Sequence, residues 1–201
     1  MPVGLSRSAS LPADYIEMAR RALAAEQCAL LVIDIQEKLL PPIFEGERVL
    51  KNSQLLIRLA GILGIPVAAT TQYAQGLGPT VPEVACLLPH AALDKLTFSC
   101  LANPGFCSLL KSFPGKPTTL LLCGMESHIC VAQTALEALR QGYAVHVASD
   151  AVSSRTQWNW QVGLERMRSA GAVISSTEMM IYELLRASGT AAFKEMLKHL
   201  R

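Results

Sequence analysis

The chain has 201 residues, of which 51% are hydrophobic and 17% are charged, so its composition fits one folded domain with a sizeable core. The 18 basic and 16 acidic residues give a formal net charge of +2, and they are spread along the chain rather than gathered into the basic region that nucleic acid requires. Aromatic residues make up only 5%, which disfavours a surface on which bases stack. We therefore expect a small-molecule substrate and no nucleic-acid partner.

The longest apolar runs, residues 28–33 and 120–123, are far shorter than the roughly 20 residues that a membrane-spanning helix needs. The first ten residues include Arg7, but no apolar segment typical of a secretion signal follows them. We therefore expect no membrane association and a cytoplasmic location. The six cysteines form no CxxC pair and lack zinc-site spacing to the four histidines, so we expect buried free thiols and no metal.

Residues 1–26 are expected to form an N-terminal extension, with a helix over residues 12–25, and residues 27–201 a single domain. Within that domain a helical stretch ending in a glycine recurs before a short apolar run. Helices are predicted over residues 49–63, 131–141, 162–170, 178–186 and 191–200, the first three ending at Gly64, Gly142 and Gly171.

Strands are predicted over residues 28–33, 66–70, 118–123, 144–149 and 172–176, with a sixth over residues 93–98. Their apolar runs are nearly continuous rather than alternating, which indicates that helices cover both faces of a parallel sheet. The pattern predicts an α/β domain with a doubly wound sheet. The ligand crevice of such a sheet lies at the carboxyl ends of its strands.

Three polar residues lie at or near these strand ends. Asp34 follows the run LLVI, where it can face the crevice or cap the next turn. Lys95, in LDKLTFS, must either reach solvent or meet a carboxylate. Cys130 is expected in the first turn of a helix, where the dipole would lower the pKa of its thiol, unless it is a buried structural cysteine. Together they offer a base, a cation and a nucleophile, which suits covalent catalysis.

Other residues flank these three and are candidates for the substrate pocket, although each also suits ordinary packing. The candidates are Gln36, Gln72, Tyr73, Thr97, Phe98 and Phe106. Asp150 and Arg155 are expected to be structural, with Arg155 pairing with Asp150 or reaching a neighbouring subunit. The segment QGLGPTVPE matches neither the dinucleotide fingerprint nor the phosphate loop, so we expect no cofactor.

Four segments in this order resemble the isochorismatase-like hydrolases, and especially the isochorismatase domain-containing proteins. They are LVIDIQEK, TQYAQGLGPTVPE, LDKLTFSC and LLLCGMESHICVAQTALEALRQGYAVHVASDAVSSR. The resemblance extends from Cys28 to about Leu185. It implies a Rossmann-like three-layer α/β/α sandwich and a catalytic triad of Asp34, Lys95 and Cys130.

By the same resemblance, Cys130 would attack a small amide, imide or related electrophile, Asp34 would move protons, and Lys95 would hold the charges in place. A cis peptide is implied between Met125 and Glu126, with the backbone amides of Glu126 and Cys130 as an oxyanion hole. TTQYAQGLGPT lacks the Asp-x-His metal pair of the related nicotinamidases, so no metal is expected. Family members commonly form oligomers, which predicts a homo-oligomer.

Two other interpretations remain open from the sequence. The first is a ligand-binding or scaffold protein that kept the triad but lost its chemistry. Glu126, beside the implied oxyanion hole, is one reason to consider it, because its carboxylate would oppose a thiolate at Cys130. The second is a flavodoxin-like cofactor binder, which suits the predicted sheet but lacks a phosphate loop.

Overall fold

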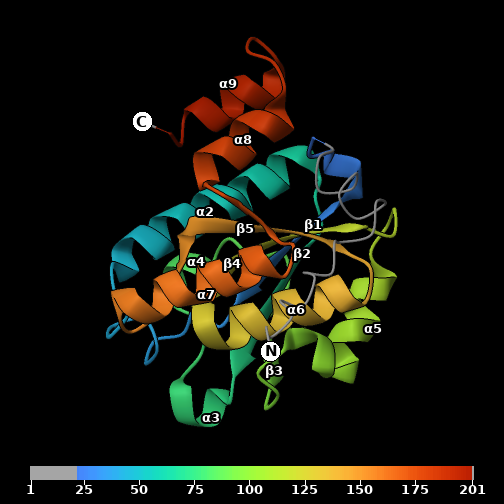
Figure 1. Cartoon of the computed structure of the whole chain (residues 1–201). Coiled ribbons are helices and arrows are strands. Elements are labelled where there is room, and N and C mark those ends of the chain that lie inside the picture. The colour runs from blue at the N-terminus through green and yellow to red at the C-terminus, as the bar shows by residue number, and fades with distance from the viewer. Residues whose placement is uncertain (1–21, 201) are drawn as a thin grey trace, which may run out of the picture.

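The computed structural model describes residues 22–200, which form a parallel six-stranded sheet with helices on both faces (Figure 1). The strands are β1 (Cys28–Ile33), β2 (Val67–Gln72), β3 (Leu93–Lys95), β4 (Thr119–Met125), β5 (Ala144–Ser153) and β6 (Val173–Ser175). Their spatial order is β3-β2-β1-β4-β5-β6, and all neighbours are parallel. This is the order of the Rossmann fold, so the predicted fold class is confirmed.

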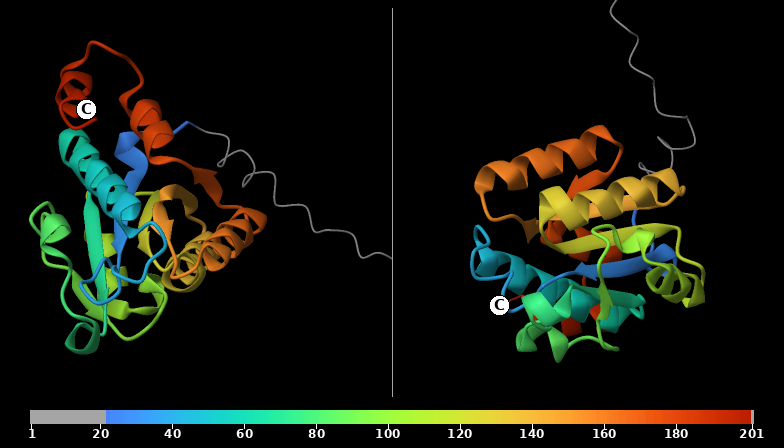
Figure 2. Two further views of the ribbon diagram at one scale, coloured as in Figure 1. Left: turned by 90° about the vertical axis from the view of Figure 1, so that its left-hand side faces the viewer. Right: turned by 90° about the horizontal axis from the view of Figure 1, so that it is seen from below.

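The helices form one layer on each side of the sheet, as the right-hand view of Figure 2 shows for α2 against α6 and α7. One layer contains α2 (Gly46–Leu63), α4 (Pro82–Ala85), α8 (Thr177–Leu185) and α9 (Ala191–Leu197), and the other contains α5 (Pro104–Ser112), α6 (Ala132–Arg140) and α7 (Gln157–Ser169). Alternate residues of β1 serve the two layers: Leu30 and Val32 join the first core, and Leu31 and Ile33 the second. Both faces are therefore apolar, as the continuous runs predicted.

The remaining elements are short. They are η1 (Ala25–Gln27), α3 (Ala74–Leu77), η2 (Cys100–Ala102) and the single π-helical turn η3 (Ser127–Val131). No helix within residues 22–200 is both long and apolar enough to cross a membrane.

Two strands, β5 and β3, differ most from their predicted ranges. β5 continues to Ser153 because its pairing with β4 resumes at Gly124 and Val152 after a bulge. β3 ends at Lys95, three residues earlier than expected, and the next residues turn outward, leaving 74% of Leu96 and 52% of Phe98 exposed.

The expected N-terminal helix over residues 12–25 lies outside the described residues up to residue 21. Residues 22–24 are not helical, so its predicted end is wrong. Leu23 is instead buried in the core, and its backbone N–H donates to Glu183 Oε1 at 2.8 Å. The domain boundary near residue 27 stays a prediction.

Gly124 allows β4 to approach β1 closely at Ile33, the residue before Asp34. Its φ is +114°, and a Cβ on it would lie 2.0 Å from the carbonyl oxygen of Ile33. No other residue type fits there without moving a strand. Because Asp34 directly follows Ile33, this contact sets the position of Asp34 relative to the segment that leads to Cys130.

Candidate active site

Asp34 and Lys95 form a buried ion pair at the carboxyl ends of β1 and β3. Lys95 Nζ lies 2.7 Å from Asp34 Oδ2, and both side chains are fully buried. The other carboxylate oxygen, Oδ1, accepts a hydrogen bond of 2.7 Å from Thr70 Oγ1. Each oxygen of Asp34 thus has a donor, as a buried charge requires. The structure therefore brings together two of the three predicted catalytic residues.

Gln72, at the end of β2, connects this pair to the third residue. Its Oε1 accepts a hydrogen bond of 2.8 Å from Lys95 Nζ and lies 4.0 Å from Cys130 Sγ. Its Nε2 donates to the carbonyl of Leu96 at 3.0 Å, which fixes the orientation of the amide. The side chains of Lys95 and Cys130 therefore both approach the same oxygen atom, Gln72 Oε1.

Cys130 lies in η3, between the end of β4 and the start of α6, rather than in the first turn of an α-helix. Burial raises the pKa of its thiol well above the usual range; the charge of Asp34 raises it further, and Lys95 lowers it. The expectation of a lowered pKa is therefore wrong. It failed because the thiol is 7% exposed, and loss of water around the thiolate outweighs the charge of Lys95.

Alkylation with iodoacetamide tests the protonation state of Cys130. A raised pKa means a smaller thiolate fraction at any given pH, so labelling of Cys130 is expected to begin only well above pH 8.5, the approximate pKa of a free thiol. The exposed Cys86 serves as the internal control and is expected to label first. Peptide mass spectrometry across a pH series measures both sites, and faster labelling of Cys130 at pH 7 would contradict a neutral thiol.

Gly163 of α7 packs directly on the turn that carries Cys130. A Cβ there would lie 2.9 Å from backbone atoms of Ser127 and His128. We expect Gly163→Ala to displace η3, destabilise the protein and reduce labelling or turnover at Cys130. The matched control is Gly61→Ala in α2, where a Cβ meets nothing within 4 Å.

The control change is expected to stabilise the protein by about 0.5–1 kcal/mol, as Gly to Ala does in a helix interior. Urea unfolding of both variants measures the difference. Equal stability of the two variants would contradict this role of Gly163.

The peptide between Met125 and Glu126 is cis, as the resemblance implied. Within residues 22–200 the N–H of Glu126 has no backbone acceptor. The carboxylate of Glu126 points to Arg155: Oε2 accepts hydrogen bonds of 2.9 Å from its backbone N–H and 3.1 Å from its Nε. The negative charge near the site is thereby paired with a cation.

Arg155 therefore pairs with Glu126, and the first of the two roles expected for it, a pair with Asp150, is wrong. Its contact with a neighbouring subunit stays a prediction. Asp150 Oδ1 instead accepts from the backbone N–H and the Oγ1 of Thr177, at 2.7 and 2.9 Å. It holds the first residue of α8, which is a structural role.

The residues predicted for the substrate pocket lie in three different environments: buried beside the site, exposed on loops, and buried in the core. Gln36 is buried and structural: its Nε2 donates to the carbonyls of Gln72 and Gly78 at 3.1 and 2.7 Å, and its Oε1 accepts from the N–H of Gln72 at 2.8 Å. Tyr73, Thr97 and Phe98 are exposed on the loops that follow β2 and β3. Phe106 belongs to α5, and its side chain is fully buried in the core. Its prediction as a residue of the substrate pocket is therefore wrong.

Thr70 and Cys100 belong to the site but were not predicted. Thr70 Oγ1, which donates to Asp34, lies 3.7 Å from Cys100 Sγ. Burial, with the charge of Asp34, raises the pKa of Cys100 to about 11. Thr70 pairs in register with Ile33, the residue before Asp34, so alignment of two predicted strands is the signal that would have found it. No sequence signal separates Cys100 from the other buried thiols.

No group of three or more His, Cys, Asp or Glu side chains within residues 22–200 is arranged to hold a metal ion.

The sequence profile of the isochorismatase domain matches residues 28–179. The chain belongs to this family. It is 39% identical over 180 residues to isochorismatase domain-containing protein 2 of Danio rerio, covering 89% of both chains. It is 38% identical over 183 residues to the secreted isochorismatase effector Isc1 of Phytophthora sojae, covering 89% of this chain and 87% of that protein.

Solved structures agree with this assignment. The MAR1 ribonuclease of Caenorhabditis elegans has a TM-score of 0.83 at 36% identity, covering 90% of this chain and 92% of its own. YcaC of Escherichia coli, described as an octameric hydrolase of unknown specificity, has a TM-score of 0.82 at 26% identity, covering 89% of this chain and 90% of its own. Membership of the family supports a hydrolase.

Proposed function

We propose that this isochorismatase-family protein is a cysteine hydrolase that cleaves a small amide, imide or related electrophile. The observation that carries the proposal is the buried Lys95–Asp34 pair, whose cation shares the Gln72 oxygen with the thiol of Cys130. A protein core does not need two buried charges beside a thiol for its stability, and such groups cluster at functional sites.

In the first half of the reaction, the sulfur of Cys130 attacks the carbonyl carbon of the substrate while its proton passes to Asp34. The raised pKa of the thiol fits this order, because the proton leaves only as the new C–S bond forms. The C–N bond then breaks, and the leaving nitrogen takes the proton from Asp34. A thioester or a related acyl-enzyme remains on Cys130.

In the second half, water attacks the thioester carbon and gives a proton to Asp34. The C–S bond breaks, the acid product leaves, and Asp34 returns its proton to the Cys130 sulfur. The cation of Lys95 offsets the negative charge that moves between the carboxylate and the sulfur. The backbone amides of Glu126 and Cys130 are the proposed donors to the oxyanion, in keeping with the N–H of Glu126, which has no backbone acceptor within residues 22–200.

A substrate panel tests this function. Small amides, cyclic imides and ureides are incubated with the protein, and ammonia or acid release is measured, with esters and a short RNA as comparison substrates. Release from at least one C–N substrate is expected. Failure of the whole panel, together with a Cys130 thiol that iodoacetamide does not label at any pH of the alkylation series, would favour the ligand-binding or scaffold alternative.

We also propose that the protein is a cytoplasmic homo-oligomer. The octameric state named for YcaC supports an assembly, and so do apolar side chains such as Trp158 and Met179, which are 73% and 61% exposed. Sedimentation velocity tests the assembly. A species heavier than one chain is expected, and a monomer would contradict the proposed homo-oligomer.

A further inference from the structure

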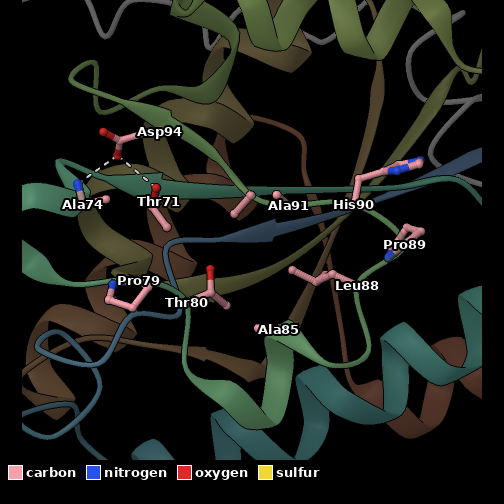
Figure 3. Close-up of a pocket in the computed structure, with 11 residues that line it drawn as sticks. Thr71, Ala74, Pro79, Thr80, Ala85, Leu88, Pro89, His90, Ala91 and Asp94 are labelled. Atoms are coloured by element: carbon pink, nitrogen blue, oxygen red, sulfur yellow. Dashed lines mark hydrogen bonds between the residues drawn. The ribbon is translucent and has the colours of Figure 1, made fainter.

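A pocket lies on the face of the sheet opposite the core cluster that contains Cys130. Figure 3 shows this pocket in close-up. Its volume is about 490 Å³, and it lies between the β2–β3 edge and the chain segments around α3 and α4. The lining residues are Thr71, Ala74, Pro79, Thr80, Ala85, Leu88, Pro89, His90, Ala91, Ala92 and Asp94. None of the proposed catalytic residues is among them, so this is a separate site.

Strand geometry explains why two sites adjoin the same edge. Successive side chains of a strand point to opposite faces, so Thr70 and Lys95 face Asp34, whereas Thr71 and Asp94 face this pocket. Thr71 and Asp94 are register partners on β2 and β3. The pocket is therefore built on paired strands rather than on loops alone.

The polar groups of this pocket are concentrated at one end. Asp94 Oδ1 accepts hydrogen bonds of 2.9 Å from Thr71 Oγ1 and from the N–H of Ala74. Asp94 is an exposed residue, and no donor within residues 22–200 reaches its second oxygen, Oδ2. Thr80 Oγ1 is buried and has no hydrogen-bond partner in the same part of the chain.

Figure 3 shows the Thr80 hydroxyl directed towards Thr71 and Asp94, whereas the His90 ring points away from them. The rest of the wall is apolar and includes Ala85 and Leu88. Among the lining residues the carboxylate of Asp94 is thus the single charge at the polar end. It is offset by no cation within salt-bridge distance in residues 22–200.

We propose that this pocket binds a small organic cation, a primary ammonium group on a compact apolar body. An ammonium has three N–H donors and no acceptor, which matches a free carboxylate oxygen and an unpaired hydroxyl. The apolar body would lie against Ala85 and Leu88, and the volume suits a ligand of that size. Asp94, at the polar end of the pocket, directly precedes Lys95 in β3.

Isothermal titration with benzylammonium tests the site, with benzyl alcohol and benzoate as uncharged and anionic analogues. Benzylammonium is expected to bind at least about tenfold more tightly than either analogue, because only it forms a charge-assisted hydrogen bond. Asp94→Asn is expected to weaken binding by about tenfold, since the amide oxygen can still accept from Thr71 and Ala74 but the charge is gone. Thr80→Val should weaken it by a smaller factor.

The matched control is Glu83→Gln, which removes the same charge from an exposed residue of α4 outside the lining set. It is expected to leave the affinity unchanged, and so is Cys130→Ala. Amide chemical shifts of Thr71 and Ala74 should move on titration of the unmodified protein. Equal binding of the three probes, equal effects of the Asp94 and Glu83 changes, shifts confined to Cys130, or no binding at all would overturn the proposal.

Discussion

Cys130→Ala is expected to lower kcat on any amide or imide that the protein hydrolyses by at least about 1,000-fold, as loss of a covalent nucleophile does in other hydrolases. The variant removes the sulfur that forms the acyl-enzyme but leaves the Asp34–Lys95 pair intact. A small buried residue such as Ala preserves the packing of η3 against α7. Circular dichroism and urea unfolding should therefore show a folded protein.

The matched control for this prediction is Cys100→Ala. Cys100 is also buried beside Asp34, so it tests whether any thiol near the carboxylate suffices. We expect this variant to keep far more activity than Cys130→Ala, because Cys100 Sγ contacts Thr70 rather than Gln72. The assignment of the nucleophile would be reversed if Cys100→Ala were the inactive variant while both proteins remained folded.

Asp34→Asn is expected to destabilise the protein by about 3–5 kcal/mol, because it leaves the charge of Lys95 buried without a counter-ion. Asn is the appropriate replacement, since Asp34 has a φ of 52° and Asn tolerates this left-handed conformation well. Its side chain also retains an oxygen for the Thr70 hydroxyl. Urea unfolding at pH 7 measures the loss in the free energy of unfolding.

Two further variants separate the ion pair from other causes. The double change Asp34→Asn and Lys95→Met removes both charges and is expected to recover much of the lost stability. Glu165→Gln breaks a pair with Arg168 in which both side chains are more than half exposed, and it should change stability little. Equal effects of the Asp34 and Glu165 changes would show that the Lys95–Asp34 pair is not a buried pair in solution.

The fold was predictable because its main signal is local. The continuous apolar residues of β1 and β4 indicated a parallel sheet covered on both faces, and the structure has that sheet. The extension of β5 was not predictable, because it depends on where pairing with β4 resumes after the bulge. Phe106 was assigned to the pocket from its neighbours in sequence, whereas its place on α5 directs it into the core.

The strand-end positions of Asp34 and Lys95 were predictable, whereas the protonation of Cys130 was not. Asp34 and Lys95 follow or end strands, which places them at one edge, and the structure pairs them. The protonation of Cys130 could not be predicted in this way, since it depends on how completely the fold excludes water from the sulfur. The contact of Gln72 with both Lys95 and Cys130 likewise depends on three separate strands ending at one point.

Mass spectrometry of the protein quenched during turnover tests the proposed covalent mechanism most directly. With a substrate found in the amide and imide panel, the mechanism predicts an acyl group on the peptide that contains Cys130, and its absence from Cys130→Ala. Turnover at an undiminished rate by Cys130→Ala, or an acyl group on another residue, would contradict it.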